Sequence, residues 1–137
     1  MFLAVNGSLM RGLALNQNLL DAGAVFVRED RTAPFYRLWS IDDRYPGMLR
    51  SREGNAREIA LEIWEMDEVG LVRVLEQEPL GLTLGCVVLK DGDEVFGILA
   101  EPFLVEGRLE ITSYGGWRGY LKAKTELFTH SAAPLPE

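Results

Sequence analysis

The chemistry that this sequence could support begins at a glycine–serine turn near its N-terminus. The apolar run at residues 1–5 leads directly into Asn6, Gly7, Ser8, Leu9 and Met10. Gly7 allows a close approach of the backbone to a ligand, Ser8 adds a hydroxyl group, and successive main-chain N–H groups in such a turn can converge on an anion. The same residue types also favour an ordinary turn. The stretch is therefore either an anion-binding loop or a plain turn.

Two carboxylates follow in the segment Glu76-Gln77-Glu78-Pro79. Residues two apart point to different sides of a helix or turn, so one carboxylate can be solvated while the other turns inward. An inward glutamate beside a polar turn could act as a general acid or base, because burial raises its pKa. The alternative is that both are solvated charges at a helix end.

A third candidate is the stretch Tyr114-Gly115-Gly116-Trp117-Arg118. Consecutive glycines between aromatic residues allow a close backbone approach, and Arg118 could hold a carboxylate through two hydrogen bonds. Tyr114 would lie beside it. The alternative is a glycine turn covered by packed aromatic side chains, with Arg118 exposed.

Composition narrows the classes of function. The chain has 137 residues, of which 47% are hydrophobic, and a formal net charge of −7. That length fits a single domain, and the negative charge argues against binding to nucleic acid. No apolar run is long enough to span a membrane, and no signal peptide precedes the first apolar run, so we expect a cytoplasmic protein.

Metal and disulfide chemistry are poorly supported. The only histidine is His130, close to the C-terminus, whereas zinc sites need several histidine or cysteine ligands. The only cysteine is Cys86, which lies in an apolar run and is expected to be a small buried residue. We therefore expect no metal and no cofactor.

Periodicity and turn residues predict a mixed α+β domain with a curled sheet or small barrel and two short helices. Helices are expected at residues 13–20 and 68–77, the second capped by Asp67. Strands are expected at residues 1–5, 24–27 with a polar continuation along a sheet edge, 35–41, 59–65, 82–89, 94–99 and 109–113. Residues 42–57 are expected to be a loop with at most a short strand near 48–49, and residues 101–108 to be irregular. The domain is predicted to span residues 1–123, with a tail at 124–137.

The order of these features resembles the gamma-glutamylcyclotransferase-like fold. The resemblance rests on a first strand that ends in Gly7-Ser8 and on a Glu-Gln-Glu segment after a strand–helix unit. It implies that the loop binds the substrate's carboxylate and amino-acid head, and that Glu78 is the general acid/base. That family usually has tyrosine before Gly-Ser, whereas this chain has Asn6.

A closer resemblance, over residues 2–121, is to the C-terminal domain of allophanate hydrolase. It is carried by Arg31-Thr32-Ala33-Pro34, by Tyr36-Arg37-Leu38 and by Tyr114-Gly115-Gly116-Trp117-Arg118. It implies decarboxylation of N-carboxycarbamate, the product of a preceding amidase. Many domains of that group carry histidine after the Leu-Asn pair, where this chain has Gln17.

These resemblances lead to one expected site and three functions. Glu78 is expected to be catalytic. The substrate-binding residues are expected to be Asn6, Gly7, Ser8, Leu9, Met10, Tyr114 and Arg118. The first function is decarboxylation of a small anionic metabolite, with a separate amidase as a possible partner. The second is a cyclotransferase that releases 5-oxoproline, and the third is a non-catalytic domain that binds an amidase.

Overall fold

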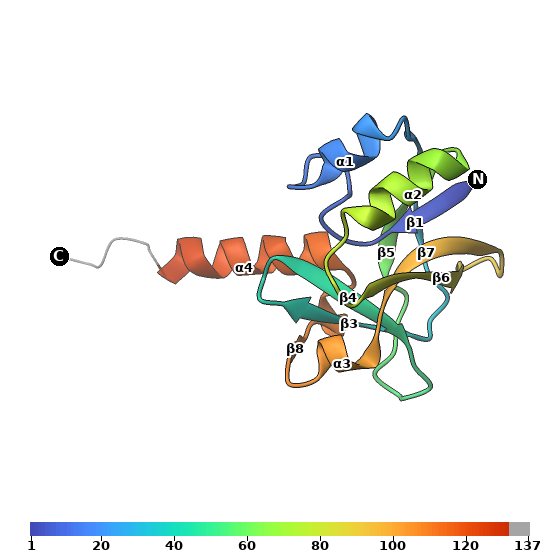
Figure 1. Ribbon diagram of the computed structural model, residues 1–137. Helices are drawn as coiled ribbons and strands as arrows, with labels where there is room; N and C mark the ends of the chain where they lie inside the picture. Colours follow the sequence, from blue (N-terminus) through green and yellow to red (C-terminus); the bar gives the residue numbers. More distant parts are fainter. Residues whose placement is uncertain (132–137) are drawn as a thin grey trace.

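A five-stranded sheet forms the centre of the molecule (Figure 1), for which the computed structural model describes residues 1–131. Its strand order is β2-β5-β1-β7-β6. The strands are β1 (Phe2–Val5), β2 (Val25–Arg31), β5 (Ala60–Glu65), β6 (Leu82–Val88) and β7 (Glu94–Ala100). Strand β1 runs parallel to β7 and antiparallel to β5. Because β1 has a neighbour on each side, residues 3–5 are buried and the strand delivers the following loop to the middle of the fold.

The five-stranded sheet curls until its two edge strands meet. Thr32, just after β2, forms an antiparallel bridge with Leu89, just after β6. The N–H of Lys90 donates to the carbonyl oxygen of Arg31 at 3.0 Å, and the N–H of Ala33 donates to that of Val88 at 2.9 Å. The prediction of a mixed fold with a curled sheet is confirmed. Within residues 1–131 the contact is a single bridge, so the sheet does not close into a barrel.

A smaller sheet has the order β4-β3-β8. Its strands are β3 (Tyr36–Ile41), β4 (Tyr45–Arg50) and β8 (Leu109–Glu110). A Cβ atom at Gly47 of β4 would lie 3.1 Å from the Cβ of Ala100, at the end of β7. The two sheets therefore touch closely at this position.

Strand β4 corrects the prediction of a loop at residues 42–57. Proline and glycine normally interrupt strands, which is why Pro46 and Gly47 indicated a loop. In the structure β4 is an edge strand, and Pro46 pairs there with Ser40 of β3. An edge position tolerates a residue that cannot donate a main-chain hydrogen bond on its outer side.

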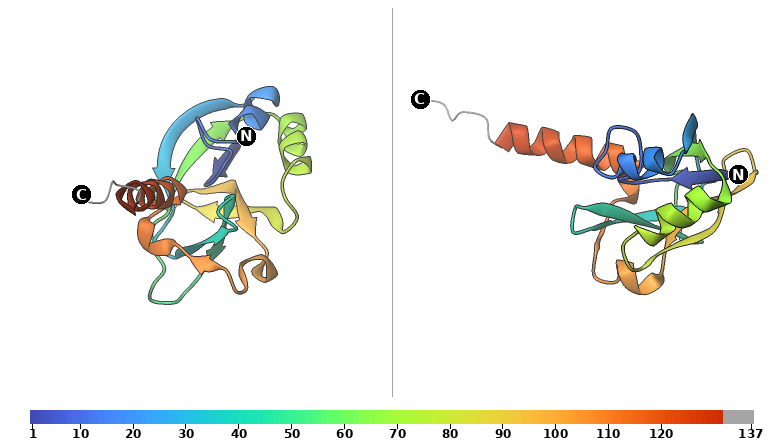
Figure 2. Two further views of the ribbon diagram at one scale, coloured as in Figure 1. Left: turned by 90° about the vertical axis from the view of Figure 1, so that its left-hand side faces the viewer. Right: turned by 45° about the horizontal axis from the view of Figure 1, so that its top comes forward.

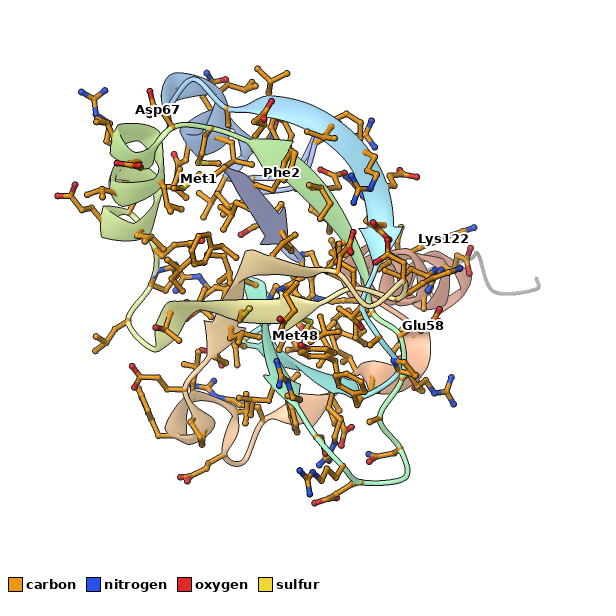
Figure 3. All side chains as sticks on the ribbon, turned by 90° about the vertical axis from the view of Figure 1, so that its right-hand side faces the viewer. Met1, Phe2, Met48, Glu58, Asp67 and Lys122 are labelled. Atoms are coloured by element: carbon orange, nitrogen blue, oxygen red, sulfur yellow. The ribbon has the colours of Figure 1, made fainter. Side chains whose placement is uncertain are left out.

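Within residues 1–131 four helices accompany the sheets, two more than predicted: α1 (Asn16–Asp21), α2 (Glu68–Glu76), α3 (Pro102–Val105) and α4 (Trp117–Ser131). Helix α3 lies in the segment expected to be irregular. Strand β8 is shorter than predicted, and a 3-10 turn, Thr112–Tyr114, follows it. Helices α1 and α2 lie side by side in the views of Figures 1 and 2. Figure 3 shows Met1 beside Asp67 at the start of α2, and the terminal ammonium group donates to the carbonyl oxygen of Met66.

Helix α4 extends away from the sheets (Figures 1 and 2) and includes part of the segment expected as a tail. Residues 124–131 are helical, and residues 132–137 lie outside the described part of the chain. Asp43, in the turn between β3 and β4, accepts hydrogen bonds from Tyr120 (2.6 Å) and Lys124 (2.8 Å) on this helix. The hydrogen bonds from Lys124, Ser40 and Tyr120 lower the pKa of Asp43 to about 2. The base of α4 is therefore held by long-range polar contacts that local sequence patterns do not reveal.

Cys86 is exposed, not buried as expected, because its side chain lies on the outer face of β6, whereas that of the next residue, Val87, lies on the buried face. Among residues 1–131, none of the helices combines the length and the apolar character that crossing a membrane requires.

The contact between α1 and α2 leads to a testable prediction. The N–H of Gly70 donates to the Asp67 side chain that caps α2, and a Cβ atom at position 70 would stand 2.5 Å from the carbonyl oxygen of Ala22. Helix propensity alone favours alanine over glycine by about 1 kcal/mol. We expect Gly70→Ala instead to lower the free energy of unfolding by about 1–3 kcal/mol, because the helices must separate.

Urea unfolding followed by circular dichroism measures this change. Val72→Ala, at an exposed position of the same helix, is the control and should change the stability by less than about 0.5 kcal/mol. A Gly70→Ala variant as stable as the wild type would contradict the close packing.

Candidate functional site

The loop after β1 is shaped by hydrogen bonds to its carbonyl groups. The carbonyl oxygen of Gly7 accepts from the N–H of Met10 at 3.0 Å, and that of Ser8 accepts from the N–H of Leu15 at 2.9 Å. Among the described residues, the turn and loop hydrogen bonds leave the main-chain N–H groups of Gly7, Ser8 and Leu9 without a protein acceptor. Buried N–H groups without a partner are rare in folded proteins. These three donors are therefore available to a bound water or anion.

Glu78 shares a small cavity with this loop. It is the second residue after α2, and its N–H donates to the carbonyl oxygen of Leu75 as the helix ends. Gly7, Ser8 and Leu9 of the loop line this cavity together with Glu78. Burial raises the pKa of Glu78 to about 7. The structure thus brings the predicted loop and the predicted acid/base together, and the side chain can gain or lose a proton near neutral pH.

The cavity in this conformation is narrow. Its volume is about 20 Å³, which is room for one water molecule. Tyr45 and Pro46 of β4 close it on a third side. A Cβ atom at Gly7 would lie 2.4 Å from Cδ of Pro46, so packing against β4 already requires glycine at position 7. Binding of a metabolite next to Glu78 would require the β4 wall to move.

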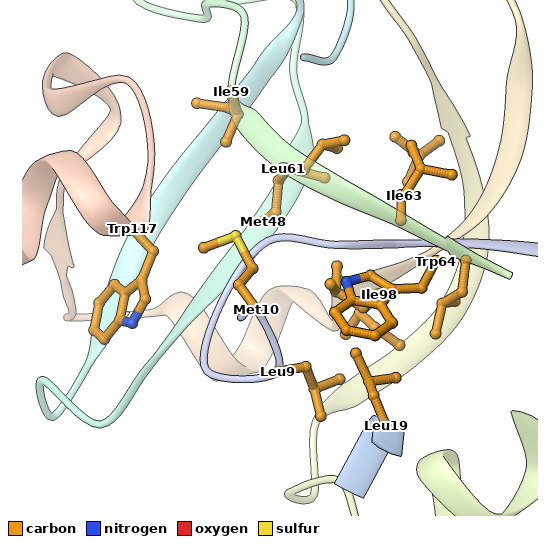
Figure 4. Close-up of a cluster of buried hydrophobic side chains, with 14 of the residues drawn as sticks. Leu9, Met10, Leu19, Met48, Ile59, Leu61, Ile63, Trp64, Ile98 and Trp117 are labelled. Carbon is orange, nitrogen blue, oxygen red and sulfur yellow. The ribbon is translucent and has the colours of Figure 1, made fainter. Parts of the chain in front are cut away.

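The side chains of Asn6, Leu9 and Met10 stabilise the structure of the loop. The side-chain amide of Asn6 donates to the carbonyl oxygen of Ile98 at 2.9 Å, which fastens the loop to β7. The side chains of Leu9 and Met10 belong to the buried hydrophobic core (Figure 4). Their side chains are therefore committed to packing, and Leu9 can take part in binding only through its main chain.

Tyr114 and Arg118 do not line the cavity of Glu78. Tyr114 is half exposed, and its ring packs edge-on against Tyr120 with 5.3 Å between the ring centroids. Arg118 lies on the opposite side of the loop, where its Nη2 atom donates to the carbonyl oxygen of Arg11 at 2.6 Å. The expected site is therefore split, with Asn6 to Leu9 and Glu78 in one part and Met10 and Arg118 in another.

A buried carboxylate, Glu62 of β5, organises this second part. It accepts hydrogen bonds from the main-chain N–H of Arg11 (3.0 Å), from Nε of Arg11 (3.2 Å), from Nη2 of Arg118 (3.0 Å) and from Nε1 of Trp64 (3.1 Å). Burial by itself raises the pKa of Glu62, but these hydrogen bonds outweigh it and hold the pKa below its ordinary value. Glu62 is thus a buried anion at neutral pH that joins β5, the loop and α4.

Glu62 was not among the residues predicted from the sequence, although a signal was present. It stands between Leu61 and Ile63 in a strand where all four residues 61–64 are buried. A charged residue inside such a run must be paired. Its partners, Arg11 and Arg118, lie 51 and 56 residues away in the chain, so the pairing could not be read from the local sequence.

Within residues 1–131 no three histidine, cysteine, aspartate or glutamate side chains gather closely enough to hold a metal ion.

Loss of the Glu62 charge should destabilise the fold. In Glu62→Gln the cations of Arg11 and Arg118 face a neutral amide, and we expect the free energy of unfolding at pH 7 to fall by about 2–3 kcal/mol. Folding lowers the pKa of Glu62, so the Glu62 carboxylate stabilises the fold at pH values above its pKa in the unfolded chain. This stabilisation is lost as the pH falls through its pKa in the folded protein. The difference between variant and wild type should therefore shrink in acid. Urea unfolding at pH 7 and pH 3.5 tests this, with Glu65→Gln at the exposed end of β5 as the control.

The raised pKa of Glu78 has the opposite consequence. The unfolded chain releases this proton near pH 4.5, whereas the folded protein retains it up to about pH 7. The neutral carboxyl group of Glu78 therefore stabilises the folded protein fully below pH 4.5. This contribution to the free energy of unfolding, at most about 3 kcal/mol, is lost as the pH rises to about 7. Glu78→Gln should be more stable than the wild type at pH 8 and similar to it at pH 4.5. Equal stability of the two proteins at both pH values would rule out the buried, protonated carboxyl.

Comparison with known proteins places the chain in a family. The family model of the allophanate hydrolase C-terminal domain matches residues 1–122. Urea amidolyase of Saccharomyces cerevisiae is 29% identical over an alignment of 128 residues, which covers 88% of this chain and 7% of that protein. The chain therefore spans a small part of its curated relatives.

Solved structures agree with this placement. A uropathogenic E. coli-specific protein has 53% identity and a TM-score of 0.86, with coverage of 88% of this chain and 94% of that one. Kluyveromyces lactis allophanate hydrolase has 26% identity and a TM-score of 0.84, with coverage of 89% and 21%. An AIG2-like protein of mouse shares the fold alone, at 21% identity and a TM-score of 0.56, with coverage of 76% and 81%. The chain, with a gamma-glutamylcyclotransferase-like fold, belongs to the allophanate hydrolase C-terminal domain family.

Proposed function

We propose that the protein is a small enzyme that decarboxylates an N-carboxycarbamate-type compound, with Glu78 as the proton donor. The observation that carries the proposal is the pairing of Glu78 with the loop in one cavity. On one side lie main-chain N–H groups of Gly7, Ser8 and Leu9 that have no protein acceptor among the described residues. On the other side lies a carboxyl group whose pKa is raised to about 7 by burial.

These groups fit the two needs of the reaction. Cleavage of the bond between nitrogen and a carboxylate carbon releases carbon dioxide and leaves the bonding electrons on nitrogen. The nitrogen must then take up a proton, which Glu78 supplies in its neutral form and regains from solvent. The loop N–H groups would hold the carboxylate that stays with the product. The overall change is one N-carboxycarbamate and one proton to one carbamate and one carbon dioxide.

The substrate class is inferred from the relatives. Their names refer to urea and allophanate, which are small nitrogen compounds with carbonyl or carboxylate groups. The related domain forms 21% of the allophanate hydrolase chain and 7% of urea amidolyase. We therefore propose that an amidase supplies the substrate to this domain and is its functional partner.

Access of the substrate requires an opening of the cavity. The walls formed by Tyr45 and Pro46 belong to the edge strand β4, which has a partner strand on one side only. Outward movement of this strand would enlarge the space between the loop and Glu78. Such a movement also explains how a carboxyl group could be desolvated in the closed state and protonated by solvent in the open state.

The assay combines this protein with allophanate and an amidase that lacks a C-terminal domain. The disappearance of N-carboxycarbamate is followed by carbon-13 NMR, relative to its spontaneous decay. We expect Glu78→Gln to lower the catalysed rate by at least about 100-fold, because a glutamine cannot donate the proton. Glu76→Gln, two residues away and exposed, is the matched control and should retain the wild-type rate. Equal rates for wild type and Glu78→Gln would exclude the acid/base role.

A cyclotransferase reaction is the second candidate. Gly7, Ser8 and Glu78 line one cavity, which supports this reaction as well. The side-chain amide of Asn6 already donates a hydrogen bond to the carbonyl oxygen of Ile98. Release of 5-oxoproline from gamma-glutamyl amides would identify it. Failure of both assays together with stable co-purification with an amidase would support a non-catalytic partner domain instead.

A further inference from the structure

We propose that a second cavity, on the opposite side of the loop from Glu78, binds a small organic anion through its carboxylate groups. The proposal does not depend on the reaction proposed for Glu78. It rests on the size of the cavity, on two unpaired cations in its wall and on the buried carboxylate that fixes a third.

The cavity has the size of a small-molecule site. Its volume is about 480 Å³, within the usual range for ligand pockets. It lies between the end of β2, strand β5, the turn after β6 and the start of α4. Its apolar wall includes Leu61 and the buried Trp117, and its polar wall carries charged side chains from four segments. A mixed lining of this kind suits an organic anion better than a bare inorganic ion.

The cavity lining carries three carboxylates and three cations. Its three carboxylates are already paired within the protein: Glu62 with Arg11 and Arg118, Glu29 with Arg11, and Asp30 with Arg28.

Two further cations on the wall, Arg31 and Lys90, form no ion pair with residues 1–131. The acidic side chains of the lining are thus paired, whereas two of its three cations form no ion pair with the described residues. Two unpaired cations on one wall favour an anionic ligand.

Arg31 and Lys90 are also held next to each other. The main-chain N–H of Lys90 donates to the carbonyl oxygen of Arg31 at 3.0 Å, where the two edges of the curled sheet meet. Arg118 approaches from the start of α4, a different segment. A ligand with two carboxylates could therefore contact cations of two separate segments at once.

Glu62 acts here as a positioning residue. Nη2 of Arg118 is engaged by the Glu62 carboxylate and by the Arg11 carbonyl oxygen, whereas Nε and Nη1 donate to no acceptor among the described residues. The Glu62 side chain is only 2% exposed, so it fixes the guanidinium while other N–H groups remain free. A planar guanidinium held in this way is prepared to bind a carboxylate.

Binding of succinate to the full chain, measured by isothermal titration calorimetry at low ionic strength, tests the proposal. The double variant Arg31→Gln/Lys90→Gln removes the two unpaired cations, both exposed, and should weaken binding at least about tenfold. The control Arg52→Gln/Lys122→Gln makes the same change of net charge at exposed positions outside the cavity. It should bind succinate as the wild type does.

Other outcomes would overturn the proposal. Absence of succinate binding, or equal binding by the two double variants, would exclude a carboxylate site in this cavity. Tighter binding of inorganic phosphate than of succinate at the same residues would reassign the site to phosphate. Loss of succinate binding in Glu78→Gln would show that the ligand occupies the Glu78 cavity. An inactive protein that still binds succinate would refute the proposed reaction and leave this site in place.

Discussion

The buried carboxylate of Glu62 is the interaction on which the arrangement of both cavities depends. An ion removed from water is stable only when several donors replace its hydration, and here these donors come from the loop after β1, from α4 and from β5 itself. The cost of burial is thus offset only when the three segments meet. Their meeting fixes the loop with one side toward Glu78 and the other toward Arg118. Glu62 therefore fixes the loop that borders both the Glu78 cavity and the second cavity.

Much of the fold could be predicted because the relevant signals are local. The strand at residues 60–65, the helix after Asp67 and the strands at residues 82–88 and 94–100 follow from apolar spacing and a capping residue. Strand β4 escaped prediction because its Pro46 is tolerated only at a sheet edge, and edge position is a property of the whole sheet. Helix α4 was not predicted, because Asp43, which binds its first turns, is about 80 residues away.

The candidate site likewise has a part that local sequence signals predict and a part that depends on the whole fold. The loop at Gly7 and Ser8 and the glutamate at position 78 could be identified because turn chemistry, helix termination and family resemblance mark them within short stretches. The separation of Arg118 from Glu78 could not be foreseen, because it depends on which side of the loop α4 approaches. The partnership of Glu62 with two arginines likewise exists only after the chain has folded. Short sequence patterns identified candidate groups, whereas three-dimensional packing decided which of them share a cavity.

Strand β2 also matters for how copies of this protein behave toward one another. An edge strand offers unpaired main-chain groups to which another molecule can add a strand. Here β2 carries the consecutive charges of Arg28, Glu29, Asp30 and Arg31, and its register shifts between Phe26 and Arg28. Charges and irregularities of this kind prevent edge-to-edge aggregation. Substitutions that remove charges from this segment, including Arg31 at the second cavity, would therefore also weaken the protection of the β2 edge against strand addition.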